Sequence, residues 1–270
     1  MILIHLIEDK PLTVSLSQLI RDFHSTKPFK VPENWLQGRT VYGGLTTALS
    51  LEAVRQELDI PLHHLRSVQV AFVGPSTQDL VFETTVLREG KSVTTLATEC
   101  LSSGVLAVRT SMVFTTHRPT TIQHSHPQPP AAERPENITE LDRPHAPPCI
   151  QNFQIRPVTG GALPFSGASF PQMIMWARHL DSEGVDPLIA LIALADVLPP
   201  AAAAVLTEPV PISTISWTFD IINPPRSGEW FLLKSSSCQA GGGYSLQDME
   251  IWSERGELIL AGRQTVAIFA

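Results

Sequence analysis

The strongest hydrophobic pattern in the chain lies in residues 35–58, WLQGRTVYGGLTTALSLEAVRQEL. A polar turn leads through Gly43 and Gly44 into a segment whose apolar residues recur at helical spacing over most of its surface. Its charged residues are confined to the last turns: Glu52, Arg55 and Glu57. A helix that is apolar on several sides must be covered on several sides, so the pattern predicts a buried helix against a sheet.

Segments of a different period follow this helix. Runs of about 8–11 residues rich in Val, Thr and Phe, each closed by Gly, Pro or Ser, are typical of strands joined by hairpins. The predicted strands are 65–73, 80–88, 92–101 and 105–115. A short amphipathic helix is predicted ahead of them, at 14–24. The first half is therefore expected to be a buried helix followed by four antiparallel strands.

The second half repeats this order. A strand is predicted at 173–178 and an apolar helix at 186–197, DPLIALIALADV, with Asp186 as the N-cap and Pro187 in the first turn. Further strands are predicted at the following segments: 212–222, 229–237, 244–253 and 258–269. Two helix-and-sheet units in one chain are the simplest account.

Two alignments of the chain with itself support a duplication. A shift of 147 positions lays RSVQVAF (66–72) on STISWTF (213–219), and a shift of about 152 lays GVLAVRTSMVF on GELILAGRQTVAIF. Between the copies, residues 117–148 are rich in Pro and poor in large apolar residues, which is typical of an extended linker. We predict an α+β protein with a first unit at 1–118, a linker at 119–150 and a second unit at 151–270.

Composition narrows the range of functions. The chain has 270 residues, 43 % of them hydrophobic, and a net charge of −7, so a packed globular protein is expected and nucleic acid is an unsuitable partner. No apolar run approaches the roughly 20 residues of a membrane span. The first segment, MILIHLIEDKPL, carries acids where a signal peptide would be basic, so we expect a cytoplasmic protein.

Neither cysteines nor histidines form a metal signature. Cys100, Cys149 and Cys238 are widely spaced and include no CxxC pair. His124 and His126 stand in the Pro-rich segment without further ligands at a fixed spacing. The Gly-rich CQAGGG follows a strand and is typical of a hairpin rather than a phosphate-binding loop. We therefore expect no metal and no cofactor.

The duplicated pattern resembles the hot-dog fold, here as a double hot-dog in one chain, and is similar to the acyl-CoA thioesterase II family and its thioesterase-like relatives. The resemblance extends over nearly the whole chain from about Phe29 and rests on WLQGRTVYGGLTTAL, FVGP and LREGKSV. It also rests on three separate positions in the second half: Asp196 in LADVLP, Thr214 in ISTISW and Gln264 in GRQTVA. The resemblance implies that these three residues bind and orient the water that attacks a thioester carbonyl.

The residue types suit that chemistry. Hydrolysis of a thioester needs a carboxylate to activate water and hydroxyl or amide groups to hold the water on one trajectory. Backbone amides at Gly43 and Gly44, at the start of a helix, would stabilise the charge that develops on the thioester oxygen. Structural roles remain open for every one of them. Asp196 would be a polar helix end, Thr214 and Gln264 ordinary strand residues, and the glycines a place where helix and sheet cross closely.

The first copy lacks most of this set. The two shifts place Ser67 opposite Thr214 and Met112 opposite Gln264, and the position corresponding to Asp196 falls near residues 49–51. Single-unit hot-dog thioesterases with an HGG motif carry an acid about seven residues after the second Gly, which here is Leu51. Glu52 comes one residue later and is the reserve candidate; Tyr42 replaces the His of that motif.

We therefore expect an acyl-CoA thioesterase with one active centre, in the second half of the chain. The alternatives are a non-catalytic protein that binds acyl ligands and a hot-dog hydratase or dehydratase. The latter needs an Asp and His pair near an N-P-x-H type segment, and none of the nine histidines has that context. Acyl-CoA is the expected partner. One double unit already pairs its sheet edges internally, which leaves a monomer open, whereas the resemblance implies association into a homodimer or homotetramer.

Overall fold

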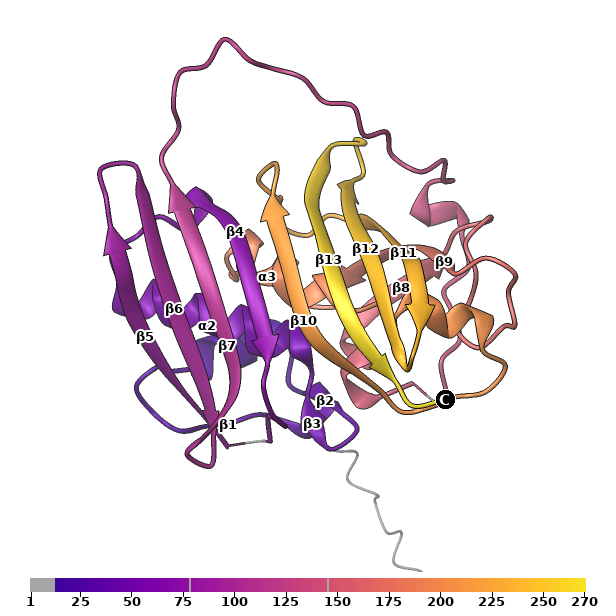
Figure 1. The fold of residues 1–270 in the computed structure, drawn as a ribbon, viewed down its shortest axis with the longest axis horizontal. Coiled ribbons are helices and arrows are strands. Elements are labelled where there is room, and N and C mark those ends of the chain that lie inside the picture. Colours follow the sequence, from indigo (N-terminus) through magenta and orange to yellow (C-terminus); the bar gives the residue numbers. More distant parts are fainter. Residues whose placement is uncertain (1–12, 78, 145) are drawn as a thin grey trace, which may run out of the picture.

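A computed structural model describes residues 13–77, 79–144 and 146–270 (Figure 1). Its α-helices are α1 Leu16–Asp22, α2 Gly43–Glu57 and α3 Pro187–Ala195. The strands of the first half are β1 Phe29–Lys30, β2 Leu36–Gln37, β3 Thr40–Val41, β4 Leu65–Phe72, β5 Asp79–Glu89, β6 Val93–Ser102 and β7 Val105–Thr115. Those of the second half are β8 Phe153–Pro157, β9 Gln172–His179, β10 Ile212–Ile221, β11 Phe231–Gly241, β12 Tyr244–Ser253 and β13 Leu258–Ile268.

The two halves share one antiparallel sheet. Its eleven strands run in the order β1-β5-β6-β7-β4-β10-β13-β12-β11-β9-β8, so β4 and β10 join the half-sheets edge to edge. α2 and α3 lie on the same face of the sheet, behind the strands in Figure 1, and pack against each other. Each helix is almost wholly buried, because it contacts the sheet on one side and the other helix on another. The predicted α+β architecture is thus confirmed, with two units fused along a strand pair.

The junction strands are related by an approximate twofold axis. Val70 on β4 pairs with Trp217 on β10, and the neighbouring pairs run outward from it in antiparallel order. Trp217 also stands 147 positions after Val70 (217 minus 70), which is the shift that aligns the two copies. A residue and its own counterpart therefore face each other at the centre of the sheet. This geometry places the counterpart helices, α2 and α3, on either side of the same axis.

Most predicted elements are confirmed within one or two residues of their ends. Asp186 caps α3 as expected, accepting a hydrogen bond from the Leu188 N–H at 2.8 Å. Four short strands, β1, β2, β3 and β8, were not predicted from the sequence. β8, FQIRP, has only five residues and lies just after the predicted linker, so its hydrophobic pattern was too short to predict a strand.

The predicted linker is extended only in its first part, where it crosses above the sheet in Figure 1. From Glu133 onward it packs on the sheet face opposite the helices: the Trp176 indole donates to the Glu133 carbonyl at 2.8 Å, and Arg156 donates to the Pro135 carbonyl. A second apolar cluster forms there, to which Ile138 contributes. It is built around these buried residues: Val158, Ile174, Trp176, Trp230, Leu232 and Trp252. The boundaries 118 and 150 stay a prediction.

Buried polar contacts also join the units. The Asn34 side-chain amide donates to Asn152 Oδ1, and the Asn152 amide donates to the Asn34 carbonyl, each at 2.7 Å. Asn152 donates further to the Cys149 carbonyl at 3.0 Å. Because the buried Asn152 side chain carries three hydrogen bonds, it ties the chain before β8 to the turn before α2.

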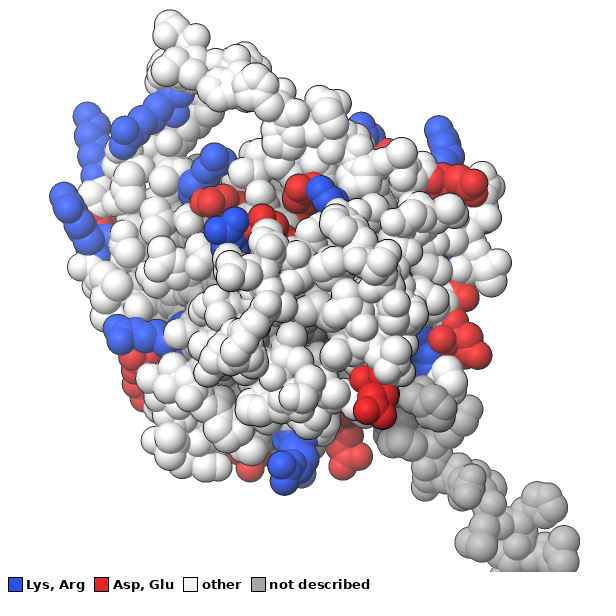
Figure 2. Space-filling view, turned by 45° about the vertical axis from the view of Figure 1, so that its right-hand side comes forward, with Lys and Arg blue, Asp and Glu red and all other residues white. Residues whose placement is uncertain are grey.

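Figure 2 shows how charged side chains are distributed on one face of the molecule. On the face shown in Figure 2, side chains of both signs lie around a large uncharged area. In the described part of the chain, no helix is long and apolar enough to cross a membrane. The first segment, residues 1–12, on which the signal-peptide argument rested, lies outside the described residues.

We predict that Asn152→Ala lowers the free energy of unfolding by about 2–3 kcal/mol, because it leaves buried partners on Asn34 and Cys149 unpaired. Urea unfolding followed by fluorescence measures this. Asn223→Ala is the matched control, since Asn223 makes one exposed hydrogen bond, to the Leu258 carbonyl. Equal effects of the two changes would contradict the structural role of Asn152.

Candidate active site

Asp196 lies where the two units meet. It is the C-cap residue of α3, directly after a run of apolar residues that is buried between the sheet and α2. Its carboxylate faces the beginning of α2: a Cβ placed on Gly43 would lie 2.8 Å from Asp196 Oδ2 and 3.2 Å from the Phe72 ring. Only glycine at position 43 leaves room for this approach. The side chain is therefore held between two helix ends, one from each unit.

Gln264 holds the carboxylate from the sheet side. It lies on β13, is 2 % exposed, and its Nε2 donates to Asp196 Oδ1 at 2.7 Å. The structure thus brings Asp196, Gln264, Gly43 and Gly44 together, from two helices and a strand that are far apart in the sequence.

Burial controls the charge of Asp196. Burial raises the pKa of its carboxyl from 3.8 to about 6, while the hydrogen bond from Gln264 and the backbone N–H of Gly44 oppose that rise. Part of the residue is still accessible to solvent. The carboxylate is consequently ionised near neutral pH and basic enough to accept a proton from water.

The first turn of α2 supplies backbone donors that the helix itself does not use. Tyr42, its N-cap, provides no side-chain hydrogen bond, and the first backbone bond of the helix is made by the Thr46 N–H. The preceding amides therefore point out of the helix end beside Asp196, where the helix dipole favours negative charge. The Tyr42 hydroxyl is also buried, and has no hydrogen-bond partner in the described part of the chain.

Thr214 lies on the same side of the sheet as Gln264. It pairs with Val266, two residues after Gln264 on β13, and a bulge follows it on β10. Paired residues and residues two apart on a strand share a face, so its hydroxyl is directed to the helix side. Among the described residues no hydrogen bond joins Thr214 to Asp196 or Gln264. A small molecule between them would have to bridge the set.

Glu52 lies apart from this group. It is fully buried near the other end of α2, nine residues after Gly43, or about 13 Å along a helix axis. Arg55 donates to both of its oxygens at 2.6 Å, and Gln56 donates at 2.8 Å. The reserve candidate is thus engaged in a local ion pair.

The strand register corrects the counterpart of Gln264. Gln264 pairs with Trp217, whereas Val70, the counterpart of Trp217, pairs with Thr110. Thr110 and not Met112 therefore occupies the equivalent place, two positions before the residue that the sequence shift of about 152 selects. Its hydroxyl lies 3.5 Å from Ser50 on α2. The first unit carries hydroxyls where the second carries an amide and a carboxylate.

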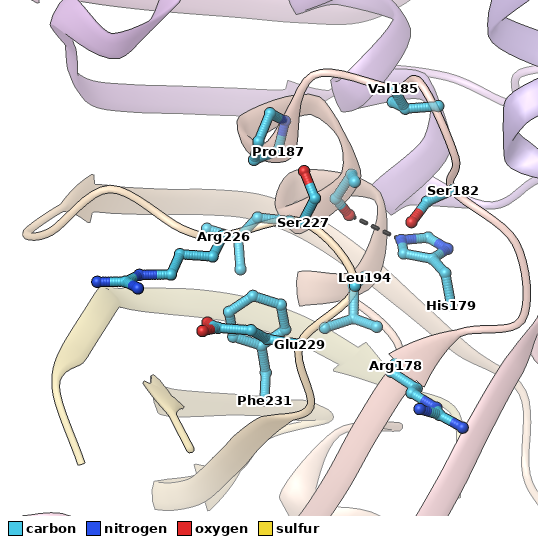
Figure 3. A pocket seen from close by; sticks show the side chains of 13 residues that line it. Arg178, His179, Ser182, Val185, Pro187, Leu194, Arg226, Ser227, Glu229 and Phe231 are labelled. Atoms are coloured by element: carbon cyan, nitrogen blue, oxygen red, sulfur yellow. Dashed lines mark hydrogen bonds between the residues drawn. The ribbon is translucent and has the colours of Figure 1, made fainter. Parts of the chain in front are cut away.

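A small cavity on another side of α3 is separate from this site. It has a volume of about 20 Å³ and is lined by His179, Leu194, Arg226 and Phe231, among others, but by none of the predicted site residues (Figure 3). His179 Nε2 lies 2.8 Å from the Ala190 carbonyl, and burial lowers its pKa to about 4. The ring is neutral and helps to hold α3 in place.

Sequence reasoning missed two groups behind Gln264. Gln247 on β12 donates through Nε2 to Gln264 Oε1 at 2.5 Å, and its Oε1 accepts the Ala201 N–H at 2.8 Å. The pattern of β12 held a signal, since Ser245, Gln247 and Met249 alternate onto the buried face. A glutamine among buried positions indicates a polar partner inside the fold.

Comparisons with known proteins agree with this architecture. A family model described as the acyl-CoA thioesterase C-terminal domain matches residues 124–268, and one described as the acyl-CoA thioesterase N-terminal domain matches residues 31–115. A search of curated proteins found no match.

Solved structures share the fold over nearly the whole chain. A conserved protein of unknown function with a hot-dog fold from Alicyclobacillus acidocaldarius is 24 % identical, with 89 % of this chain and 92 % of that chain covered and a TM-score of 0.79. An acyl-CoA thioesterase II from Mycobacterium marinum is 24 % identical, with 84 % and 88 % covered and a TM-score of 0.69. The tesB protein of Mycobacterium avium subspecies paratuberculosis is 18 % identical, with 90 % and 91 % covered and a TM-score of 0.72. These similarities confirm the predicted double hot-dog fold.

The raised pKa of Asp196 predicts a stability effect. Between about pH 4 and 6 the folded protein binds a proton that the unfolded chain does not, so the ionised carboxylate costs stability above pH 6 and nothing below pH 4. Asp196→Asn should therefore stabilise the protein at pH 8, by at most about 3 kcal/mol, and this gain should vanish toward pH 4.

Thermal unfolding at the two pH values tests this. We expect Tm to rise by several degrees at pH 8. Asp220→Asn, at an exposed position of β10, is the control and should change Tm little at either pH. A lower Tm for Asp196→Asn at pH 8 would show that the carboxylate contributes to folding stability instead.

Proposed function

Because the chain belongs to the acyl-CoA thioesterase family, we propose that it hydrolyses the thioester of acyl-CoA to a free acid and CoA, with Asp196 as the general base. The observation that carries the proposal is the position of that carboxylate. It is ionised near neutral pH, held by Gln264, and set against the open first turn of α2. The same three features are what attack by water on a thioester requires.

Each step follows from these side chains. The substrate places its carbonyl beside the first turn of α2, and Thr214 and Gln264 hold a water between the carbonyl carbon and Asp196. Asp196 takes a proton from the water as its oxygen bonds to that carbon, and the carbonyl oxygen becomes an oxyanion. The backbone amides of this first turn stabilise the charge without reorganising, since they are fixed by the helix.

Collapse of the intermediate completes the reaction. The carbon–sulfur bond breaks, the electron pair leaves with the CoA sulfur, and the proton held by Asp196 returns to the thiolate. A carboxyl with a pKa of about 6 suits both steps, because it is a base toward water and an acid toward a thiolate whose own pKa lies near 8.5. No cofactor enters the scheme.

A panel of acyl-CoA thioesters of different chain length, assayed for free thiol with the purified protein, tests the proposal. We expect Asp196→Asn to lower kcat by about 10²–10⁴-fold, the usual contribution of a positioned general base. Wild-type kcat/KM should fall below about pH 6, because protonation removes the base. Asp220→Asn should keep full activity and the same profile.

Two results would count against this assignment. Equal turnover by Asp196→Asn and the wild type would show that Asp196 is not the base. Tight binding of acyl-CoA with no thiol release by the wild type would support the non-catalytic ligand-binding alternative.

A glycine substitution tests the approach of α2 separately. In Gly43→Ala the new Cβ would come within 2.8 Å of Asp196 Oδ2, so the carboxylate must move. We expect a loss of kcat of roughly 10–100-fold, because displacements on the order of 1 Å have that effect. Gly241→Ala is the control: a Cβ there meets nothing within 4 Å. Unchanged turnover by Gly43→Ala would exclude a role for the close contact.

Two further expectations stay predictions. The family resemblance implies a homodimer or homotetramer, which sedimentation of the purified protein would measure. The expected cytoplasmic location would be checked by fractionating cells that produce the protein.

A further inference from the structure

Two buried glutamines form a continuous chain of hydrogen bonds that ends on Asp196. The Ala201 N–H donates to Gln247 Oε1 at 2.8 Å, Gln247 Nε2 donates to Gln264 Oε1 at 2.5 Å, and Gln264 Nε2 donates to Asp196 Oδ1 at 2.7 Å. Gln247 is 1 % exposed, so water does not compete for these groups. The scheme proposed above uses Asp196 and Gln264 but gives Gln247 no role.

The direction of this chain is fixed at both ends. The Ala201 N–H can only donate, so it requires the oxygen of Gln247 and not its nitrogen. The nitrogen of Gln247 must then face the oxygen of Gln264, which turns the nitrogen of Gln264 toward Asp196. At that end an ionised carboxylate can only accept. One orientation of the two amides therefore satisfies all three hydrogen bonds, and a flip of either breaks two.

We propose that Gln247 is a positioning residue that locks the Gln264 side chain with its N–H toward Asp196, so that the general base stays ionised and correctly aimed. The inference rests on the proposed thioesterase function. Gln247 touches neither base nor substrate and acts only through Gln264. Without it, the Gln264 amide can rotate, and its oxygen can then face the carboxylate and repel it.

The first unit has the same strand register but lacks the hydrogen-bonded pair of glutamines. There Thr110 replaces Gln264, and its partner across to β6 is Thr98 in place of Gln247. A threonine side chain is too short to bond both a side chain on the neighbouring strand and a backbone N–H of another segment, as Gln247 does. Ser50 is the nearest polar group of α2, so this unit has no carboxylate to orient. The two buried glutamines thus occur in the same unit as Asp196.

A purely structural role has to be separated from positioning. Gln247 also holds the Ala201 N–H, the first donor of the short helix Ala201–Val205, so its loss would loosen that helix too. A loosened helix reduces the amount of folded, active protein. It does not change the pH at which the remaining molecules lose their base.

The test compares Gln247→Met with the wild type over the acid limb of the pH profile. We expect kcat to fall by about 10–100-fold, KM to change by less than about threefold, and the midpoint of the acid limb to rise by roughly one pH unit. Tyr42 and Cys149, the other titratable groups near Asp196, do not interfere. Burial raises the pKa of Tyr42 well above 10 and that of Cys149 to about 12.

Coupling to Gln264 is the second readout. If Gln247 acts through Gln264, the double variant Gln247→Met/Gln264→Met should be no slower than Gln264→Met alone. Ser245→Ala is the matched control, since it removes a buried hydroxyl from the same face of β12. It should leave the acid limb in place. Should Gln247→Met not fold, Gln247→Thr copies the residue of the first unit and replaces it.

Two outcomes would overturn the proposal: an acid limb that does not move, or losses in the double variant that multiply. Absence of any thiol release by the wild type would instead contradict the thioesterase function. The positioning role is then read without activity, from the pH above which the stability difference between Asp196→Asn and the wild type stops growing, because that pH marks the pKa of Asp196 in the folded protein. In a Gln247→Met background this pH should rise, and an unchanged value would exclude the positioning role.

Discussion

The hydrogen-bonded pairing of β4 with β10 is the constraint on which the rest of the molecule depends. It fuses two half-sheets into one surface, and it sets α2 and α3 side by side on that surface. Because the helices pack antiparallel beside this seam, the carboxylate at the end of α3 is placed against the first turn of α2. Neither unit contains this arrangement by itself.

The site is also a compromise between two demands on one side chain. Burial makes the charge of Asp196 energetically unfavourable, yet the hydrogen bonds that it accepts are sufficient to keep it ionised near neutral pH. Gln264 and the α2 amides offset part of the cost of burial, and the remainder is a loss of folding stability. Such local losses are common where an enzyme keeps a reactive group out of water.

The features that could be predicted from the sequence are those that leave a periodic pattern of hydrophobic residues. The helices and long strands follow hydrophobic periodicity, and the shift of 147 even identified Val70 and Trp217 as counterparts. The pairing of β4 with β10 could not be predicted in this way, because hydrophobic periodicity identifies strands but not which strands pair. The shift of about 152 chose Met112 over Thr110, since bulges change the register without changing composition. Gln247 was missed because its partners come from distant segments.

The twofold relation between β4 and β10 has a consequence for how the two units diverged. In a pair of identical subunits related by such an axis, every substitution appears twice, so both sites must keep the acid or both must lose it. Joining the copies in one chain removes that symmetry requirement. In the first unit Ser50, Thr98 and Thr110 are small and neutral, whereas the second unit carries Asp196, Gln247 and Gln264. Covalent fusion thus lets one half carry the buried polar set while the other supplies the helix end that faces it.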